Sequence, residues 1–251
     1  MLTYNQNPMR ISCDLDGVLA DMDGALAALA EEEFGISAKL RKQKHEDGKP
    51  AEDEIPKAAG DAVQADGSSS NGDAPEPPGA AVLSRLSARQ QARLWQRVRE
   101  TRNFWESLKE HEPGIVRRLQ HLAYQHRWDV LFVTQRPSTA GRTAQVQSQR
   151  WLHRQGFDLP AVYTTQGSRG PIAAALTLDA HIDDRLENCV DISGESKAWP
   201  ILVWRDEESH AQIAQSAQQI GIAVVGTVAE ALALLEAGHR GADRGQRSRA
   251  G

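Results

Sequence analysis

The sequence predicts an α/β protein built on a mostly parallel sheet with helices on both faces. Short apolar runs alternate with longer stretches whose apolar residues recur at helical spacing, which is the pattern of βαβ units. More than a hundred residues separate the first predicted strand from the second, and they contain helical patterns near residues 25–34 and 83–99. An interval of that length predicts a small, mostly helical lobe inserted after the first strand.

Six short runs rich in β-branched or other apolar residues fit the strands of such a sheet. They are Arg10–Cys13, Asp129–Thr134, Ala161–Thr165, His181–Asp183, Ile201–Trp204 and Ile222–Val225. Between them, apolar residues recur every three or four positions, which predicts helices packed against the sheet. The predicted helices of the core are Gly114–Gln125, Ala140–Gln155, Glu207–Gln219 and Val228–Ala237, and those of the inserted lobe are Ala25–Phe34 and Leu83–Arg99.

Residues 42–80 differ in composition from the rest of the chain. They hold five of the eleven prolines and no aromatic residue, and their only branched apolar residues are Ile55 and Val63. Such a segment cannot bury enough apolar surface to offset the entropy lost on ordering, so we expect a disordered acidic linker. Its four lysines and nine carboxylates account for the whole net charge of −5. Residues 238–251, with four arginines and no large apolar residue, are expected to form a disordered basic tail.

The composition excludes several classes of protein. With 251 residues, of which 40% are hydrophobic, the chain can bury one sizeable core and a smaller lobe. It contains no apolar run of the ~20 residues that a membrane-spanning helix needs, and its first residues lack the pattern of a secretory signal. Two cysteines, Cys13 and Cys189, give neither a disulfide framework nor a zinc cluster. A reducing, cytoplasmic setting is therefore expected.

Polar residues follow several predicted strands at the point where each strand ends. The motif DLDG follows the first strand, a threonine and a glutamine end the second, and two aspartates end the fourth. Because the carboxyl ends of parallel strands meet at one edge of a sheet, we expect these side chains to converge there. So many carboxylates favour a divalent cation, and oxygen ligands without paired histidines or cysteines favour Mg²⁺. The residues concerned are Asp14, Asp16, Thr134, Gln135, Arg169, Asp183 and Asp184.

These motifs resemble those of the haloacid dehalogenase (HAD) superfamily of phosphatases. The ordered set is DLDGV at 14–18, the strand-end Thr134, the basic Arg169 and the acidic pair at 183–184. The phrases DLDGVLAD, WLHRQGF and IDDRLENC resemble the 5′(3′)-deoxyribonucleotidase branch, and the resemblance covers about residues 9–40 and 103–206. It implies a Rossmann-like HAD core at residues 1–20 and 103–237 and a helical cap at residues 21–41 and 81–102.

The resemblance also implies a mechanism. Asp14 would attack the phosphorus of a monoester to form an aspartyl-phosphate, and Asp16 would protonate the departing oxygen and later deprotonate water. Thr134 and Gln135 would bind the phosphate oxygens, and Arg169 would balance their charge. The implied Mg²⁺ ligands are Asp14, the backbone carbonyl of Asp16, and one of Asp183 or Asp184.

Arg169 departs from the superfamily pattern, which usually has a lysine at this position. A planar guanidinium fork does not occupy the same place as a compact ammonium group, so phosphate geometry and rate are expected to differ. Arg136 and Arg185 are alternative sources of the positive charge.

Several residues admit a second interpretation. Asp21 is expected to cap a helix rather than to bind a ligand. Phe104 and Trp105 either pack in the core or form a stacking wall for a nucleobase. Arg185 and Asn188 either cap the helix after Asp184 or belong to the site.

The expected function is a Mg²⁺-dependent phosphomonoesterase, resembling a 5′-nucleotidase, whose partner is a small phosphate ester such as a nucleoside monophosphate. The alternatives are a phosphatase for another small ester or for a nucleic-acid 3′-phosphate end, and a non-catalytic binding module with a HAD fold. The sequence lacks GxxxxGK[ST], a GxGxxG after a strand, and GxSxG, which argues against Walker-type kinases, dinucleotide oxidoreductases and serine hydrolases. Four arginines in the tail are a weak signal for nucleic acid, and nothing indicates an oligomeric state.

Deletion of residues 44–78 is expected to leave folding and Mg²⁺-dependent phosphatase activity intact, because this segment has too little apolar surface to contribute to a core. Circular dichroism, thermal melting and phosphate release from the shortened chain would test this. Loss of the folded state on deletion would contradict the linker interpretation.

Overall fold

The computed structural model describes residues 8–35 and 83–249, with backbone alone for residues 239–249. The strands are β1 (Arg10–Cys13), β2 (Asp129–Thr134), β3 (Ala161–Thr164), β4 (Ala180–Asp183), β5 (Trp199–Val203) and β6 (Ala223–Val225). The helices are α1 (Met22–Phe34), α3 (Ala88–Glu100), α4 (Ile115–His126), α5 (Ala144–Gln155), α6 (Arg169–Ala175), α7 (Leu186–Glu195), α8 (Glu207–Gln218) and α9 (Val228–Arg249), with a 3₁₀ turn η1 at Phe104–Glu106.

The six strands form one parallel sheet in the order β3-β2-β1-β4-β5-β6, which confirms the predicted α/β class. From β1 the chain builds outward through β2 to β3, then crosses back to β4 on the other side of β1 and continues to β6. The order therefore reverses between β1 and β4, and ligands of open α/β sheets bind at the carboxyl ends of the strands at such a reversal.

Helices cover both faces of the sheet, as β5 illustrates. Successive side chains of a strand point to opposite faces. Ile201 and Val203 belong to the apolar cluster that includes residues of α4, α5 and α9, whereas Leu202 belongs to a second cluster with residues of α7 and α8. Residues 200–203 of the strand are all apolar because both of its faces are buried there.

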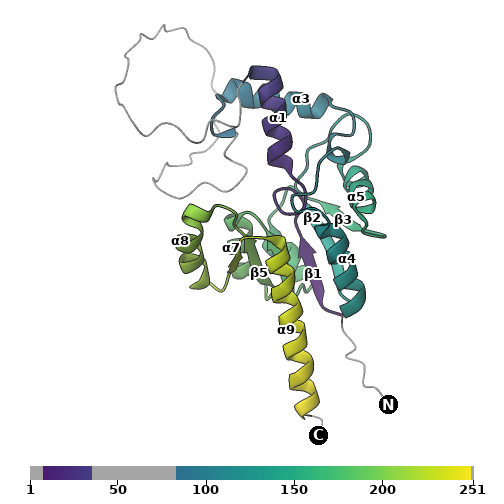
Figure 1. Cartoon of the computed structure of the whole chain (residues 1–251), viewed down its shortest axis with the longest axis vertical. Coiled ribbons are helices and arrows are strands. Elements are labelled where there is room, and N and C mark those ends of the chain that lie inside the picture. Colours follow the sequence, from purple (N-terminus) through teal and green to yellow (C-terminus); the bar gives the residue numbers. More distant parts are fainter. Residues whose placement is uncertain (1–7, 36–82, 250–251) are drawn as a thin grey trace.

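The inserted lobe consists of α1 and α3, which lie together beyond the carboxyl ends of the strands (Figure 1). Leu26 of α1 and Leu94 of α3 are fully buried, and Glu33 of α1 pairs with Arg93 and Arg97 of α3. The described residues of the lobe fall within the predicted ranges 21–41 and 81–102, whereas the predicted linker at 42–80 lies outside the described residues.

Backbone hydrogen bonds fasten the lobe to the core where the chain leaves and where it returns. At the exit, Asp21 N donates to Lys109 O (2.9 Å) and His111 N donates to Leu19 O (2.8 Å). At the return, Ala140 N donates to Arg99 O (2.7 Å) and Asn103 N donates to Ala140 O (2.7 Å). Both ends of the insertion are therefore attached to loops that surround the carboxyl end of the sheet.

The C-terminal helix is longer than predicted. The sequence predicts that the helix ends at Ala237 and that residues 238–251 are disordered, but α9 continues to Arg249, so this prediction is wrong for the backbone of residues 238–249. Extending an existing helix adds a hydrogen bond for each residue fixed, without a new nucleation step, so a sequence with no apolar face can still continue one.

The other boundaries move by a few residues. The helix predicted from residue 140 begins at Ala144, because Thr143 caps it through its Oγ1, which accepts from Val146 N (3.3 Å). Strand β5 begins at Trp199, two residues earlier than expected, and includes Pro200.

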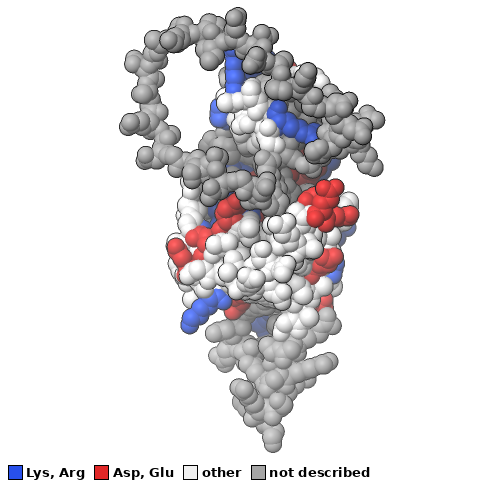
Figure 2. All heavy atoms as spheres, turned by 90° about the vertical axis from the view of Figure 1, so that its left-hand side faces the viewer, with Lys and Arg blue, Asp and Glu red and all other residues white. Residues whose placement is uncertain are grey.

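The described surface carries charge of both signs. Figure 2 shows acidic and basic side chains scattered singly or in small groups over the described part of one face, with no broad basic area there. Among residues 8–35 and 83–249, no helix has both the length and the apolar character that crossing a membrane requires.

Replacing Glu112 with alanine is expected to destabilise the protein by about 2 kcal/mol, because charge-assisted hydrogen bonds contribute roughly that much. The Glu112 carboxylate accepts from Val228 N (2.7 Å) and Ala229 N (3.0 Å) at the start of α9, and from Arg205 Nη2 (3.2 Å). Urea unfolding would measure the change. Glu187→Ala, at a side chain that is 66% exposed, is the control and should change stability by less than about 0.5 kcal/mol.

Candidate functional site

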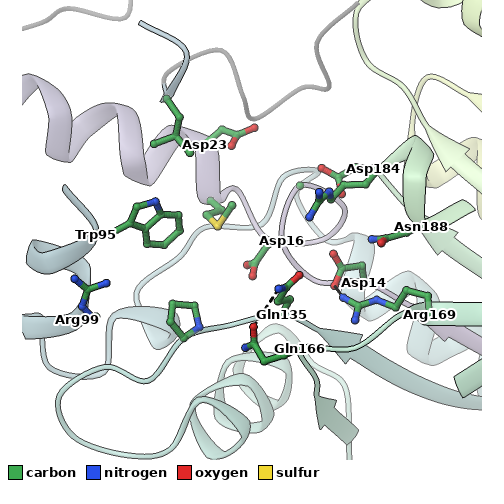
Figure 3. Close-up of a pocket in the computed structure, with 15 residues that line it drawn as sticks. Asp14, Asp16, Asp23, Trp95, Arg99, Gln135, Gln166, Arg169, Asp184 and Asn188 are labelled. Carbon is green, nitrogen blue, oxygen red and sulfur yellow. Dashed lines mark hydrogen bonds and ion pairs between the residues drawn. The ribbon is translucent and has the colours of Figure 1, made fainter. Parts of the chain in front are cut away.

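A pocket of about 540 Å³ lies between the carboxyl edge of the sheet and the helices of the inserted lobe. In Figure 3, Asp16 lies near its centre, Trp95 and Arg99 of α3 line one side, and Asp14, Arg169, Asp184 and Asn188 line the other. The sheet therefore contributes the charged floor and the lobe contributes an opposing wall. The site lies at the reversal of strand order, where the strand-end residues were expected to converge.

The loop after β1 brings two carboxylates into this pocket. Asp14 N donates to Ile182 O (2.9 Å), which continues the pairing of β1 with β4 up to the site. Gly17 then turns the chain with φ +78°, and a Cβ at this position would lie 1.9 Å from Asp184 Oδ2. Arg205 fixes the turn from outside by donating to the carbonyls of Gly17 and Val18. Position 17 thus needs glycine both for its conformation and for its close approach to Asp184.

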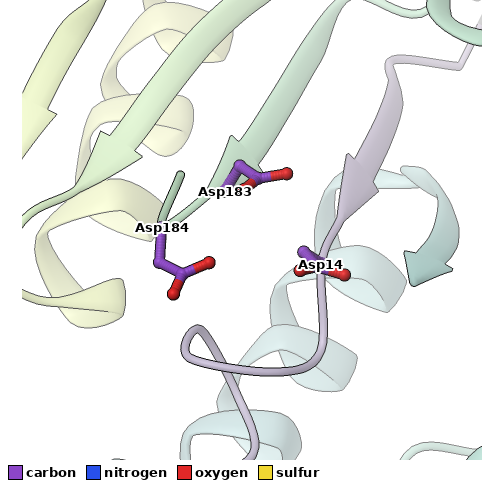
Figure 4. A group of neighbouring side chains, drawn as sticks. All are labelled: Asp14, Asp183 and Asp184. Atoms are coloured by element: carbon purple, nitrogen blue, oxygen red, sulfur yellow. The ribbon is translucent and has the colours of Figure 1, made fainter. Parts of the chain in front are cut away.

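Asp14, Asp183 and Asp184 form an acidic cluster, in which one oxygen from each residue lies within 4.8 Å of the others (Figure 4). Asp14 Oδ1 and Asp184 Oδ1 are buried without a hydrogen-bond partner among the described residues. Burial and then the nearby Asp183 raise the pKa of both Asp14 and Asp184 well above the usual value. Three carboxylates this close together, two of them with an unbonded oxygen, suit a hard cation such as Mg²⁺.

Asp183 differs from its two neighbours because the protein satisfies both of its oxygens. His181 Nε2 contacts Oδ2 (2.9 Å), Asn188 Nδ2 donates to both oxygens (3.1 and 3.0 Å), and Arg185 N donates to Oδ1 (2.9 Å). Burial alone would raise the pKa of Asp183, but the contacts with His181, Arg185 and Asn188 outweigh burial and lower it. His181 is itself oriented by Ser12 Oγ, 2.6 Å from Nδ1. Of the acidic pair, Asp184 therefore has the oxygen that is more available to a metal.

The carboxylate of Asp16 lies outside the acidic cluster and is bound by Arg136. Arg136 Nε donates to both oxygens (3.1 and 2.9 Å), and Nη2 donates to Oδ1 (2.6 Å). Thr134 Oγ1 donates to Asp16 Oδ2 (3.4 Å). The resemblance implies that Asp16 would bind Mg²⁺ through its backbone carbonyl. This role is compatible with the ion pair between its side chain and Arg136.

Two of the three residues expected to bind phosphate, Gln135 and Arg169, line the pocket. Gln135 donates to Gln166 Oε1 (3.1 Å) on the pocket wall, whereas Thr134 is fully buried at the end of β2 and its hydroxyl donates to Asp16. Arg169 is buried, with Nη2 3.9 Å from Asp14 Oδ1, and its Nε has no hydrogen-bond partner among the described residues. Arg169 thus faces the predicted nucleophile, while Arg136 is already paired with Asp16.

The start of α6, which carries Arg169, is fixed by α7. Asp191 Oδ2 accepts from Ser168 Oγ and from Gly170 N (2.6 Å). Gly170 allows the two helices to approach, since a Cβ there would lie 2.6 Å from Asp191 O. Arg169 is therefore placed by the packing of α6 on α7.

The structure decides between several of the alternatives left open by the sequence. Asp21 caps α1, as predicted, because its Oδ1 accepts from Gly24 N (2.8 Å). Phe104 and Trp105 are buried core residues, so the interpretation of this pair as a nucleobase wall is wrong. Asn188 hydrogen-bonds to Asp183 instead of capping α7.

The lobe contributes residues to the pocket that the sequence did not predict. Trp95 and Arg99 lie one helical turn apart on α3, and Met22 and Asp23 open α1. The spacing of Trp95 and Arg99 within the predicted helix 83–99 places them on one face, but the pattern does not indicate which face meets the site. Burial and then the nearby Asp21 raise the pKa of Asp23 to about 6.

No protein-family model matches this chain, and no curated protein matches it.

Without divalent metal, the protein is expected to lose stability as the pH rises from about 4 through about 6. Unfolded aspartates ionise near pH 4, whereas Asp14, Asp184 and Asp23 have raised pKa values in the folded protein. In this window the folded state holds protons that the unfolded state has released, so rising pH favours unfolding. Lowered pKa values act in the opposite sense: that of Asp183 below about pH 4, and that of His111, lowered chiefly by burial, as the pH nears the usual histidine value of 6.5. Three aspartates with raised pKa values oppose this one histidine, so the net change expected is still a fall.

Melting temperatures measured in EDTA across this range would test the expected fall. Asp184→Asn should flatten the pH dependence, and Mg²⁺ should stabilise the wild type more at neutral than at acid pH. The matched control Asp158→Asn, at a side chain that is 74% exposed, should leave the profile unchanged. A melting temperature that rises with pH in EDTA would be inconsistent with this account.

Proposed function

We propose that this chain is a phosphomonoesterase that uses Asp14 as its nucleophile and Mg²⁺ as its cofactor. The observation that carries the proposal is the pair of buried, unbonded oxygens, Asp14 Oδ1 and Asp184 Oδ1, within the acidic cluster. Arg169 adds a buried guanidinium 3.9 Å from Asp14 Oδ1, where a phosphoryl group would bring negative charge. The resemblance of the strand-end motifs to the HAD superfamily supports the same assignment.

The residues of the pocket can carry both halves of such a reaction. In the first half, a carboxylate oxygen of Asp14 attacks phosphorus, and the bond between phosphorus and the ester oxygen breaks as Asp16 gives that oxygen a proton. In the second half, Asp16 takes a proton from water, the water oxygen attacks phosphorus, and the bond to Asp14 breaks to release inorganic phosphate. Bound Mg²⁺, held by Asp14 and Asp184 with Asp183 beside them, would stabilise the charge on the phosphoryl oxygens.

The wall opposite the acidic cluster supports a nucleoside monophosphate as the substrate. Trp95 offers a partly exposed indole face to a planar base, a role that the sequence left open for Phe104 and Trp105. The volume of about 540 Å³ lies within the usual range for pockets that bind small molecules. Gln135 and Gln166 add amide groups that can hydrogen-bond to a base or sugar.

The proposed setting is the reducing cytoplasm, in which the buried, unpaired thiols of Cys13 and Cys189 are stable. The scattered charge on the face in Figure 2 gives no specific support to the alternative of a nucleic-acid end as the substrate.

Phosphate release from nucleoside monophosphates and simple phosphate esters tests this proposal. We expect turnover with Mg²⁺ and none with EDTA, and Asp14→Asn should reduce kcat below about a thousandth of the wild-type value, as removal of a nucleophile commonly does. Asp158→Asn, an exposed aspartate outside the pocket, is the matched control and should keep full activity.

Two other results would contradict the proposal. Release that survives Asp14→Asn would exclude Asp14 as the nucleophile. A folded protein that binds Mg²⁺ but turns over no ester would favour the non-catalytic binding module.

A further inference from the structure

We propose that Arg136 is the positioning residue for the acid and base of the reaction, because it fixes the Asp16 carboxylate in one orientation at the floor of the pocket. This inference rests on the proposed function, in which Asp16 transfers the protons. Arg136 lies two residues beyond the strand-end Thr134 and belongs to none of the motifs that carry the family resemblance.

Contacts with the protein chain hold the guanidinium of Arg136 on every side. Two of its nitrogens, Nε and Nη2, form the fork on Asp16, and the third, Nη1, donates to Ser148 Oγ (2.8 Å). Its central carbon lies 4.9 Å from the centre of the Trp105 ring, so the cation also rests on an aromatic face. Ser148 in turn donates to Ala144 O (2.8 Å), and Trp105 Nε1 donates to Pro137 O (3.0 Å). The fork therefore has one orientation, set by α5 and by the segment that returns from the lobe.

The pair is asymmetric with respect to the pocket. The Arg136 side chain is 0% exposed, whereas that of Asp16 is 9% exposed and lines the pocket. Asp16 can thus reach a substrate oxygen, and Arg136 lies behind it. A planar fork that contacts both carboxylate oxygens restricts rotation of the carboxylate, which a single point charge would not do.

Restricted rotation matters because three other carboxylates lie nearby. An unrestrained Asp16 side chain could turn toward a cation bound in the acidic cluster. It could then no longer donate a proton to the leaving group. Arg136 prevents this by offering Asp16 a closer and geometrically matched partner. Its effect on catalysis is therefore expected at the proton transfer to the ester oxygen and not at the attack by Asp14.

Leaving-group dependence separates this role from a general structural one. A positioned acid helps a poor leaving group far more than a good one, which needs little protonation. We would measure kcat/KM for aryl phosphates whose phenols span a wide range of acidity, in the wild type, Arg136→Lys, Arg136→Gln, Asp16→Asn and the double variant Asp16→Asn/Arg136→Lys. For the poorest leaving groups we expect Arg136→Lys to lose about 10²-fold, and for the best ones less than about 3-fold, as with Asp16→Asn.

The double variant completes the test. If Arg136 acts through Asp16, adding Arg136→Lys to Asp16→Asn should cause little further loss for any ester. Equal losses across all leaving groups in Arg136→Lys, or additive losses in the double variant, would overturn the proposal. Arg142→Lys is the matched control, because Arg142 lies on the same loop, has a side chain that is 45% exposed, pairs with Glu106 and does not line the pocket.

Thermal melting with and without Mg²⁺ shows whether each variant folds and keeps its metal site. If both Arg136 variants fail to fold, Ser148→Ala provides the decisive measurement, since it removes one hydrogen bond of Arg136 and leaves the ion pair in place. It should show the same selective loss for poor leaving groups, several-fold in size, and a uniform effect or none would overturn the inference. A wild type without activity, or activity that survives Asp14→Asn, would instead refute the proposed function.

Discussion

Asp14, Asp183 and Asp184 repel one another, and burial removes most of the water that would screen their charges. The surrounding structure offsets this repulsion in a different way for each carboxylate. Asp183 receives hydrogen bonds from His181, Arg185 and Asn188, while Asp14 faces Arg169. Asp184 lies against Gly17 and keeps an unbonded oxygen. A bound cation would offset the remaining repulsion in the cluster.

A second set of interactions supports the loop that carries Asp14 and Asp16. Trp105, just after the lobe, rests on Arg136, which in turn holds Asp16. On the other side, Arg205 binds the turn at Gly17 and Glu112, whose carboxylate also caps α9. The loop that carries Asp14 and Asp16 is therefore supported from elements at opposite edges of the site, and its geometry depends on how those elements pack.

The sheet and the residues at its strand ends were predictable from the sequence. The carboxyl ends of parallel strands meet at one edge of the sheet, so the residues that follow each apolar run converge there whatever the details of side-chain packing. The pairing of Asp16 with Arg136 was not predictable in this way, since it joins residues 120 positions apart through a particular pair of rotamers. Trp95 was missed, and the choice between core packing and a stacking wall was left open for Trp105, for a related reason. Both are tryptophans near the lobe, and only the way α3 packs decides which ring faces the pocket.

The attachment of the lobe at two places limits how it can move as a rigid body. Hydrogen bonds at Asp21 and His111 form one pivot, and those at Arg99 and Asn103 form another. Rotation of the lobe about the line through both pivots is the displacement that disturbs these hydrogen bonds least. The backbone of Arg99 lies at one pivot and would move little during such a rotation, whereas side chains farther from the axis would move more.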